Sequence, residues 1–241
     1  MIHFPPLRTG RLDVQLRELT ISEAVALAAT TPGRHEAGVA EMLRHVVKSA
    51  GGEHSEPGRW TVQERMLVVG HYLSCVSDAA DFELGSSRFS SYLDPQHDSA
   101  PQSVDIGELC GDRWECRQLT GDQAAAMEQV CRSRFDWVRA DMAARMHCAG
   151  DAAPPDASSE PGKYADWLAD RVKAFGALPE SDFAELFAGY RVGLAELHHL
   201  FALGFDDQGH VALGKDPVAD TAPARFPVSS CLSRVARALG S

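Results

Sequence analysis

The spacing of apolar residues predicts helices along most of the chain. Between residues 61 and 77, apolar side chains recur at steps of four and three residues, so they fall on one face of a helix. The members of this stripe are Val62, Met66, Val69, Leu73 and Val76. Thr61 precedes Glu64 by three residues, which is the spacing of a capping box at a helix start. Thr20 and Glu23 repeat this spacing and predict a second helix start.

The same reasoning predicts further helices. We expect them at about residues 35–48, 120–146, 163–175, 181–201 and 229–239. The helix at 120–146 would be about 40 Å long, at a rise of about 1.5 Å per residue. Pro32-Gly33 is expected to end the helix that begins at Thr20. Ser181 is expected to cap the helix at 181–201.

Other segments show the pattern of strands. Leu12, Val14 and Leu16 alternate with polar residues, which predicts a half-buried strand. Between residues 78 and 119 the helical spacing fades, and apolar residues set among Gly, Ser, Pro and Asp indicate short strands of a small sheet. Residues 205–213 predict a hairpin, with its turn at Asp207-Gln208-Gly209.

Together these elements predict an α+β fold that is mostly helical. Its helices would pack around a small antiparallel sheet, and its C-terminal helical part would carry the β-hairpin. The segment 149–162, AGDAAPPDASSEPG, has the composition of a flexible linker. We therefore expect an N-terminal α+β domain at 1–148 and a C-terminal helical domain with the hairpin at 163–241.

Composition and charge disfavour some classes of function. The chain has 241 residues, of which 44% are hydrophobic and 24% charged, as in ordinary globular proteins. Its net charge of −11 disfavours binding to nucleic acid or to an anionic membrane surface. We expect no signal peptide, because MIHFPPLRTGRLDV has prolines where an apolar core is needed. No apolar stretch approaches the roughly 20 residues that cross a bilayer, so we expect a cytosolic protein.

The cysteines offer a weak case for zinc. A site could in principle use Cys110, Cys116 and Cys131 with either His147 or Cys148. Zinc-binding motifs need two ligands within a short turn of two to four residues, and no pair here has that spacing. We therefore expect the cysteines to be buried thiols, and we expect neither a metal nor a cofactor.

The adjacent histidines His198 and His199 raise a similar question. On the predicted helix, neighbouring residues point in different directions, so this pair could not grip one ion together. Glu196 and His199 have the ExxH spacing of di-iron bundles, but those need a second copy of the motif. We interpret these histidines as helix-edge residues beside an aromatic core.

Catalytic motifs are equally sparse. The sequence contains neither a GxSxG elbow nor a glycine-rich phosphate loop. Four arginines on the predicted long helix could form a nucleic-acid strip, but their spacing scatters them around the helix and acidic residues lie between them. They are Arg132, Arg134, Arg139 and Arg145. We interpret them as a solvated face, or as a mixed-charge face against a partner.

Four aromatic residues near linkers and helix ends are candidates for protein contacts. They are Trp60, Trp137, Tyr164 and Trp167. Large aromatic side chains often anchor interfaces, and equally often they complete helix caps within one chain. The sequence leaves these two alternatives open.

Several stretches, in order along the chain, resemble proteins encoded among the tail and baseplate genes of tailed bacteriophages. They are ELTISEAVALA, WTVQERMLVVGHYLS, DFELGSSRFSSYLD, LTGDQAAAMEQV, WVRADMAARM and ESDFAELFAGYRVGLAELHHLFALGFD. The resemblance implies a non-enzymatic structural or assembly protein that binds other tail proteins, with an oligomer within the assembly as one form. It implies a location in the host cytoplasm during assembly, or in the virion tail. The linker at 149–162 favours an assembly chaperone.

An alternative hypothesis remains from the residues themselves. In it the chain is a bacterial metal-binding or hydrolytic enzyme that uses His198, His199 and the cysteines. A regulatory or adaptor protein of bacterial origin would share every interaction feature of the first hypothesis.

Overall fold

The chain folds as an α+β protein, as predicted. The computed structural model describes residues 2–29, 34–51, 55–94 and 101–240. In these residues, eight α-helices surround small antiparallel sheets of two or three strands. The helices are α1 Ile21–Ala28, α2 His35–Val46, α3 Val62–Ser77, α4 Gly121–Val130, α5 Arg134–Arg145, α6 Pro161–Gly176, α7 Glu180–Glu196 and α8 Arg234–Gly240. None of them is long and apolar enough to cross a membrane.

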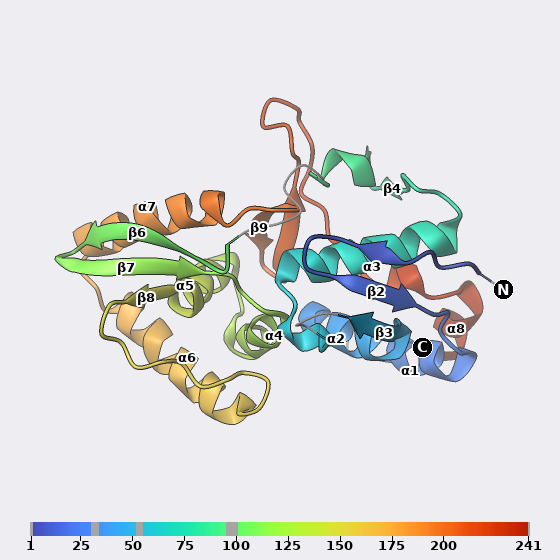
Figure 1. Ribbon diagram of the computed structural model, residues 1–241, viewed down its shortest axis with the longest axis horizontal. Coiled ribbons are helices and arrows are strands. Elements are labelled where there is room, and N and C mark those ends of the chain that lie inside the picture. The colour runs from blue at the N-terminus through green and yellow to red at the C-terminus, as the bar shows by residue number, and fades with distance from the viewer. Residues whose placement is uncertain (1, 30–33, 52–54, 95–100, 241) are drawn as a thin grey trace.

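Two three-stranded sheets lie at opposite ends of the molecule (Figure 1). One consists of β1 Leu7–Arg8, β2 Asp13–Leu16 and β3 Val47–Gly51, and the other of β6 Ser103–Leu109, β7 Asp112–Arg117 and β8 Met146–Cys148. Two small hairpins, β4 Glu83–Leu84 with β5 Ser87–Arg88 and β9 Ala202–Asp206 with β10 Gly209–Leu213, complete the strands of the described residues. The alternating strand predicted from Leu12, Val14 and Leu16 is β2, and all three side chains are buried.

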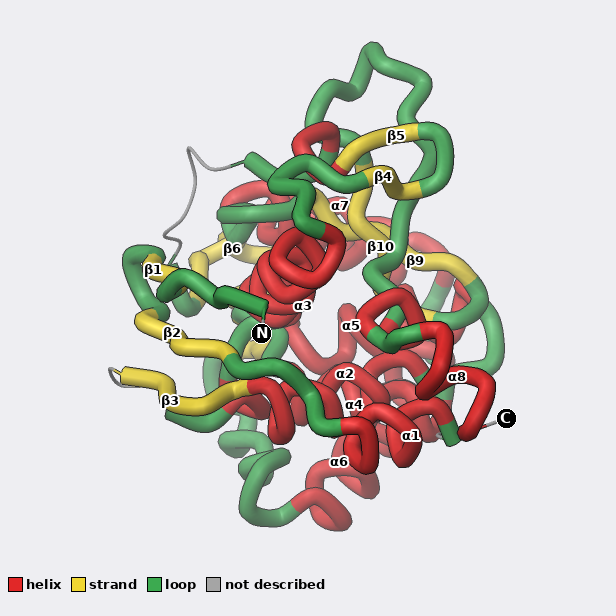
Figure 2. The backbone as a smooth tube through the Cα atoms, turned by 90° about the vertical axis from the view of Figure 1, so that its right-hand side faces the viewer, coloured by secondary structure: helices red, strands yellow, loops and turns green. Residues whose placement is uncertain are grey.

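Helix α3 lies in the middle of the fold (Figure 2). The capping box predicted at its start is present, with the Thr61 side chain accepting from the Glu64 N–H. The prediction of a single apolar face is wrong. Gln63, Glu64 and Arg65 are buried along with the apolar residues of the first turns, because each polar side chain has a partner elsewhere in the chain. The capping box at Thr20 is also confirmed, at the start of α1.

The long helix predicted at 120–146 is two helices. After α4 the chain turns at Cys131, and Ser133 caps α5 by accepting a hydrogen bond from the Asp136 N–H at 3.2 Å. A new cap inside the apolar stripe therefore ends one helix and starts another. The predicted solvated face is wrong for Arg145, which is buried in the core.

The C-terminal hairpin is confirmed. β9 and β10 pair in antiparallel register around Asp207 and Gln208, and Gly209 adopts a φ of 127° at the end of the turn. Helix α7 differs from the prediction at both ends. Pro179 precedes it in place of Ser181, and the helix ends at Glu196, so His198 and His199 follow the helix and are not part of it.

The segment predicted as a linker has defined contacts in the structure. Arg171 forms an ion pair with Asp151 at 2.9 Å, and Arg59 forms one with Asp156 at 3.0 Å. The division into domains at 1–148 and 163–241 stays a prediction. Pro32-Gly33, the expected end of the first helix, lies outside the described residues.

Candidate functional site: a buried charged cluster

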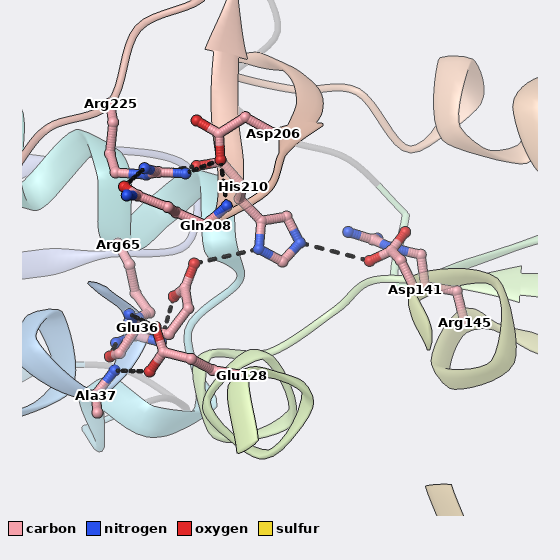
Figure 3. Close-up of polar contacts among 10 residues, drawn as sticks. All are labelled: Glu36, Ala37, Arg65, Glu128, Asp141, Arg145, Asp206, Gln208, His210 and Arg225. Carbon is pink, nitrogen blue, oxygen red and sulfur yellow. Dashed lines mark hydrogen bonds and ion pairs between the residues drawn. The ribbon is translucent and has the colours of Figure 1, made fainter. Parts of the chain in front are cut away.

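His210 on β10 lies between the carboxylates of Glu36 and Asp141 (Figure 3). Its Nδ1 is 3.2 Å from Glu36 Oε1 on α2, and its Nε2 is 3.5 Å from Asp141 Oδ1 on α5. The imidazole is 0% exposed. A carboxylate can only accept hydrogen bonds, so this placement favours a proton on both ring nitrogens, which is the imidazolium form of His210. The hairpin thus joins two helices that lie far apart in the sequence.

Asp141 holds a second set of partners. Its Oδ2 accepts from Arg145 Nε at 2.7 Å and from the Tyr190 hydroxyl at 2.6 Å. Arg145 lies four residues further along α5, so the helix itself brings this pair together. Tyr190 comes from α7, so the carboxylate of Asp141 connects α5, α7 and the hairpin.

Glu36 has partners on the other side of the cluster. Arg65 Nη1 on α3 lies 3.5 Å from Glu36 Oε2, and Arg65 Nη2 donates to the Glu36 backbone carbonyl at 3.0 Å. Glu128 on α4 accepts from the backbone N–H groups of Glu36 and Ala37, at 2.9 and 3.1 Å. These two groups belong to the first turn of α2, where Arg34 provides no side-chain cap. A carboxylate from another helix therefore caps α2.

The environment sets the charge of each group. Burial alone would raise the pKa of Glu36 and Asp141, but their cationic and hydrogen-bonding partners outweigh it and hold each pKa at about 2. Burial would lower the pKa of His210, and hydrogen bonds and charges from the same two carboxylates raise it instead. Burial and the neighbouring Asp141 raise the pKa of Tyr190 well above its ordinary value, so it stays a hydroxyl donor. The cluster is thus ionised but internally compensated.

This arrangement leaves little room for chemistry on a bound molecule. A histidine acting as general acid or base needs one ring nitrogen directed at its substrate, and both nitrogens of His210 face carboxylates. The cavity beside Glu36 and Arg65 measures about 10 Å³. That volume accommodates about one water molecule. The geometry suits a structural cross-link between the hairpin and the helices.

A second buried histidine lies at the other end of the hairpin. His199 Nδ1 is 3.2 Å from the Leu197 carbonyl, and its Nε2 is 3.2 Å from Thr61 Oγ1. A carbonyl only accepts, so Nδ1 carries the proton and Nε2 accepts from the hydroxyl. Burial lowers the pKa of His199 to about 4. This ring is therefore neutral.

Gln63 on α3 fixes the backbone around His199. Its Oε1 accepts from three successive N–H groups, those of His199, Leu200 and Phe201, at 3.1, 3.0 and 3.1 Å. Its Nε2 donates to the Leu197 carbonyl at 3.4 Å. The Gln63 side chain thus provides hydrogen-bond partners for the backbone between the end of α7 and the start of β9. His198 is half-buried, with Nε2 3.8 Å from Asp94 Oδ2.

The predicted aromatic contacts lie mainly inside the chain. Trp60, Trp137 and Tyr164 are buried. Trp137 contacts His210 edge-on, with ring centroids 5.6 Å apart. Trp167 is half-buried, stacked on His147 at 6.1 Å. Their predicted role in contacts with other proteins stays a prediction, and the contacts described here are within one chain.

The cysteines and His147, where no zinc site is expected, have other surroundings in the structure. Among the described residues, no three or more His, Cys, Asp or Glu side chains are grouped so as to hold a metal ion. Cys116 and Cys131 are buried and Cys110 is exposed, so the expectation of buried thiols fits some of the cysteines. Burial raises the pKa of Cys116 and Cys131 to about 12. His147 Nε2 lies 3.1 Å from the Ala144 carbonyl.

Sequence reasoning missed the charged cluster. The only local signal was the four-residue spacing of Asp141 and Arg145, which is common on solvated helix faces. Glu36 and His210 are 174 residues apart, and no sequence pattern links them.

Comparison of the chain with protein-family models, with curated proteins and with solved structures finds no match.

Proposed function

We propose that this chain is a non-enzymatic structural or assembly protein of a bacteriophage tail or baseplate. It acts through contacts with other tail proteins, in the host cytoplasm during assembly or in the virion tail, and an oligomer within the assembly is compatible with this role. The resemblance of its sequence to such proteins supplies the phage assignment. The buried polar groups contact other groups of the same chain, and this supports a non-catalytic role.

The observation that carries the non-enzymatic part is the state of the two buried histidines. His210 has both nitrogens directed at carboxylates, and His199 has both directed at groups of its own chain. Perturbed pKa values often mark catalytic sites, but networks of internal ion pairs perturb them as well. The partners described above account for these shifts without a substrate.

The surface supports contacts with other proteins. The larger hollows, about 260 and 390 Å³, are lined by residues outside the charged cluster. Several large apolar side chains are exposed near these hollows or on helix faces. They include Ile21, Phe135, Val192, Val235 and Leu239.

Co-purification tests this proposal. The tagged chain, co-expressed with the tail and baseplate proteins of a tailed bacteriophage, is expected to isolate identified tail proteins in a stoichiometric complex. The same chain is expected to contain no stoichiometric metal by elemental analysis, and EDTA is expected to leave its melting temperature unchanged. A melting temperature that falls with EDTA would support the metal-enzyme alternative instead.

A further inference from the structure

The hairpin of β9 and β10 has one covered edge and one free edge (Figure 2). On β10, Ala212 exchanges both of its backbone hydrogen bonds with Ala224, at 2.7 and 2.9 Å. The next residue, Arg225, adds a bond from its Nε to the His210 carbonyl at 3.3 Å. The outer edge of β10 is therefore occupied by the chain that returns to it at residues 224 and 225.

The contacts of β10 also show which backbone groups of β9 are turned outward. In an antiparallel pair, facing residues alternate between those that exchange hydrogen bonds and those that do not. Ala212 directs both of its backbone groups at Ala224, so its partner on β9, Leu203, directs its own N–H and C=O away from β10. Phe205 lies two residues later and does the same, whereas Gly204 between them faces β10. Within the described part of the chain, no group bonds to the outward N–H and C=O of Leu203 or Phe205.

Strand β9 is not enclosed by the rest of the chain. Gly204, Phe205, Asp206 and Asp207 line part of an open hollow of about 390 Å³. The two carboxylates beside the strand already have partners within the chain. Asp206 pairs with an arginine at 2.5 Å, and Asp207 accepts from the Arg134 N–H at 2.9 Å. The free groups near this hollow are thus those of the β9 backbone.

Other edge strands of the fold have features that discourage pairing with another chain. β1 has two residues, β3 carries Lys48, and β6 carries Asp105 and Glu108 with a register shift between residues 105 and 107. Short length, charge and bulges are the usual means by which proteins keep an edge strand from pairing. β9 has five residues, ALGFD, and none of these features before Asp206. Its free edge is suited to receive another strand.

We infer that this edge pairs with the same edge of a second copy of the chain. The two β9 strands run antiparallel about a two-fold axis beside Gly204, so that Leu203 of each copy faces Phe205 of the other. Each outward N–H and C=O group then meets its complement, because Leu203 and Phe205 lie symmetrically about Gly204. The two hairpins join into one continuous sheet.

The sequence of β9 suits this self-pairing. The two copies of Gly204 face each other at the axis, where strands approach most closely and where side chains would crowd. Asp206 of one copy lies opposite Ala202 of the other, so the like charges of the two strands stay apart at the two ends. The inference goes beyond the proposed function, and it does not depend on the phage assignment.

Amide exchange tests this pairing in the original chain. Sedimentation velocity, from low micromolar to a few hundred micromolar chain, is expected to show a monomer that converts into a dimer. Over the same range, exchange of the Leu203 and Phe205 amides is expected to slow at least about tenfold, while the Gly204 amide, which faces β10 in both states, changes little. A monomer at every concentration, or a dimer without this alternating protection, overturns the inference.

Two variants at the axis test the symmetry. Gly204→Lys and Gly204→Glu each place like charges directly opposite one another, so each is expected to weaken the dimer at least about tenfold. The added Cβ would lie 2.8 Å from Leu213 Cδ2, the end of a flexible side chain that can move, so both variants are expected to fold, as circular dichroism checks. Mixed in equal amounts, they are expected to form a dimer with one chain of each variant, which native mass spectrometry identifies.

The mixture distinguishes lost pairing from a folding defect, because two misfolded chains would not restore one another. Gly162→Lys and Gly162→Glu are the matched controls, since Gly162 is an exposed residue of α6 with no atom within 4 Å of an added Cβ. Both controls are expected to dimerise as the original chain does. Dimers of unchanged strength in the Gly204 variants, or a mixture that stays monomeric, overturn the inference.

Three outcomes separate this inference from the proposed function. A chain that isolates tail proteins but stays monomeric excludes the second copy and keeps the proposed function. A chain that dimerises through β9 but isolates no tail proteins keeps this inference while the proposed function fails. Protection of the Leu203 and Phe205 amides only after a tail protein is added identifies a strand of that protein as the occupant, which overturns the second copy.

Discussion

The two buried histidines at either end of the β9–β10 hairpin differ in charge although both lie in the core. His210 lies between Glu36 and Asp141, and those carboxylates raise its pKa. His199 lies between a carbonyl and a hydroxyl, and burial lowers its pKa to about 4. Burial opposes charge at both positions, so the partners decide the protonation state.

This difference shows two ways of attaching the same hairpin. One end is held by compensated charges from α2, α3 and α5 with the Tyr190 hydroxyl from α7, and the other by neutral hydrogen bonds from α3. Buried ion pairs are costly to break because removal of one partner leaves a buried charge. Neutral contacts cost less to lose, unless several backbone groups lose their acceptor at once.

The largest expected effect is at the charged end. Asp141→Ala removes the acceptor shared by Arg145, Tyr190 and His210, and leaves two buried cations with one carboxylate fewer. We expect the free energy of unfolding in urea to fall by about 3–5 kcal/mol. Asp170→Ala, an exposed position on α6, is the control and is expected to change it by less than about 0.5 kcal/mol. Similar losses in both variants would contradict the ionic cross-link.

The next effect is at the neutral end. Gln63→Leu keeps the size of the side chain but deprives three backbone N–H groups of their acceptor. We expect a loss of about 3 kcal/mol in the same measurement, since each buried unpaired group costs about 1–3 kcal/mol and the loop can relax in part. Amide hydrogen exchange should accelerate most at His199, Leu200 and Phe201. Unchanged exchange there would show that the Gln63 contacts do not hold this segment.

The pH dependence of stability should separate the two ends. Because the pKa of His210 is raised, its protonation contributes fully to the free energy of unfolding below about pH 6.5. This contribution is lost as the pH rises through the folded-state pKa. The pKa of His199 is lowered to about 4, so the unfolded chain binds a proton between about pH 6.5 and 4 that the folded chain does not. As the pH falls through that window, the free energy of unfolding should decrease by on the order of 3 kcal/mol from this residue.

Two variants isolate these contributions. His210→Gln should flatten the decline of stability on the alkaline side, and His199→Gln should reduce the decline on the acidic side. His199→Gln should reduce the acidic decline in stability only in part, because the pKa values of His35 and His147 are also lowered to about 4. Identical pH profiles for the original chain and both variants would refute the assigned charge states.

The smallest effect is expected on the surface of the same hairpin. Asp206 pairs with Arg225 at 2.5 Å, but half of the Asp206 side chain is exposed. Asp206→Asn should lower the free energy of unfolding by about 0.2–1 kcal/mol, and less at high salt. A loss as large as that of Asp141→Ala would mean that burial does not set the strength of ion pairs in this fold.

Local patterns predicted most of the elements. The capping boxes at Thr20 and Thr61, the strand around Val14 and the hairpin turn before Gly209 all depend on residues within a few positions of one another. The burial of Gln63, Glu64 and Arg65 on α3 was missed because their partners lie far away in the sequence, whereas one further error has a local cause. The break between α4 and α5 follows from a cap at Ser133 within a stripe that reads as continuous.

The candidate site was not predictable from the same signals. Glu36, Arg65 and His210 each lie in a separate element, and a polar residue in a helix is read as exposed unless its partner is known. His199 was misplaced because the predicted helix continued past Glu196, whereas Gln63, some 136 residues earlier in the chain, holds the backbone that follows the helix. Such pairings require the three-dimensional fold.

The separation of 174 residues between Glu36 and His210 has a consequence for biosynthesis. At roughly 5–20 residues per second, a ribosome takes about 10–35 s to add His210 after Glu36. Throughout that interval the carboxylate of α2 and the guanidinium of α3 have no imidazolium to complete their surroundings. The surroundings of Glu36 can therefore be completed only after His210 has been synthesised, and earlier folding intermediates are expected to keep these charges hydrated.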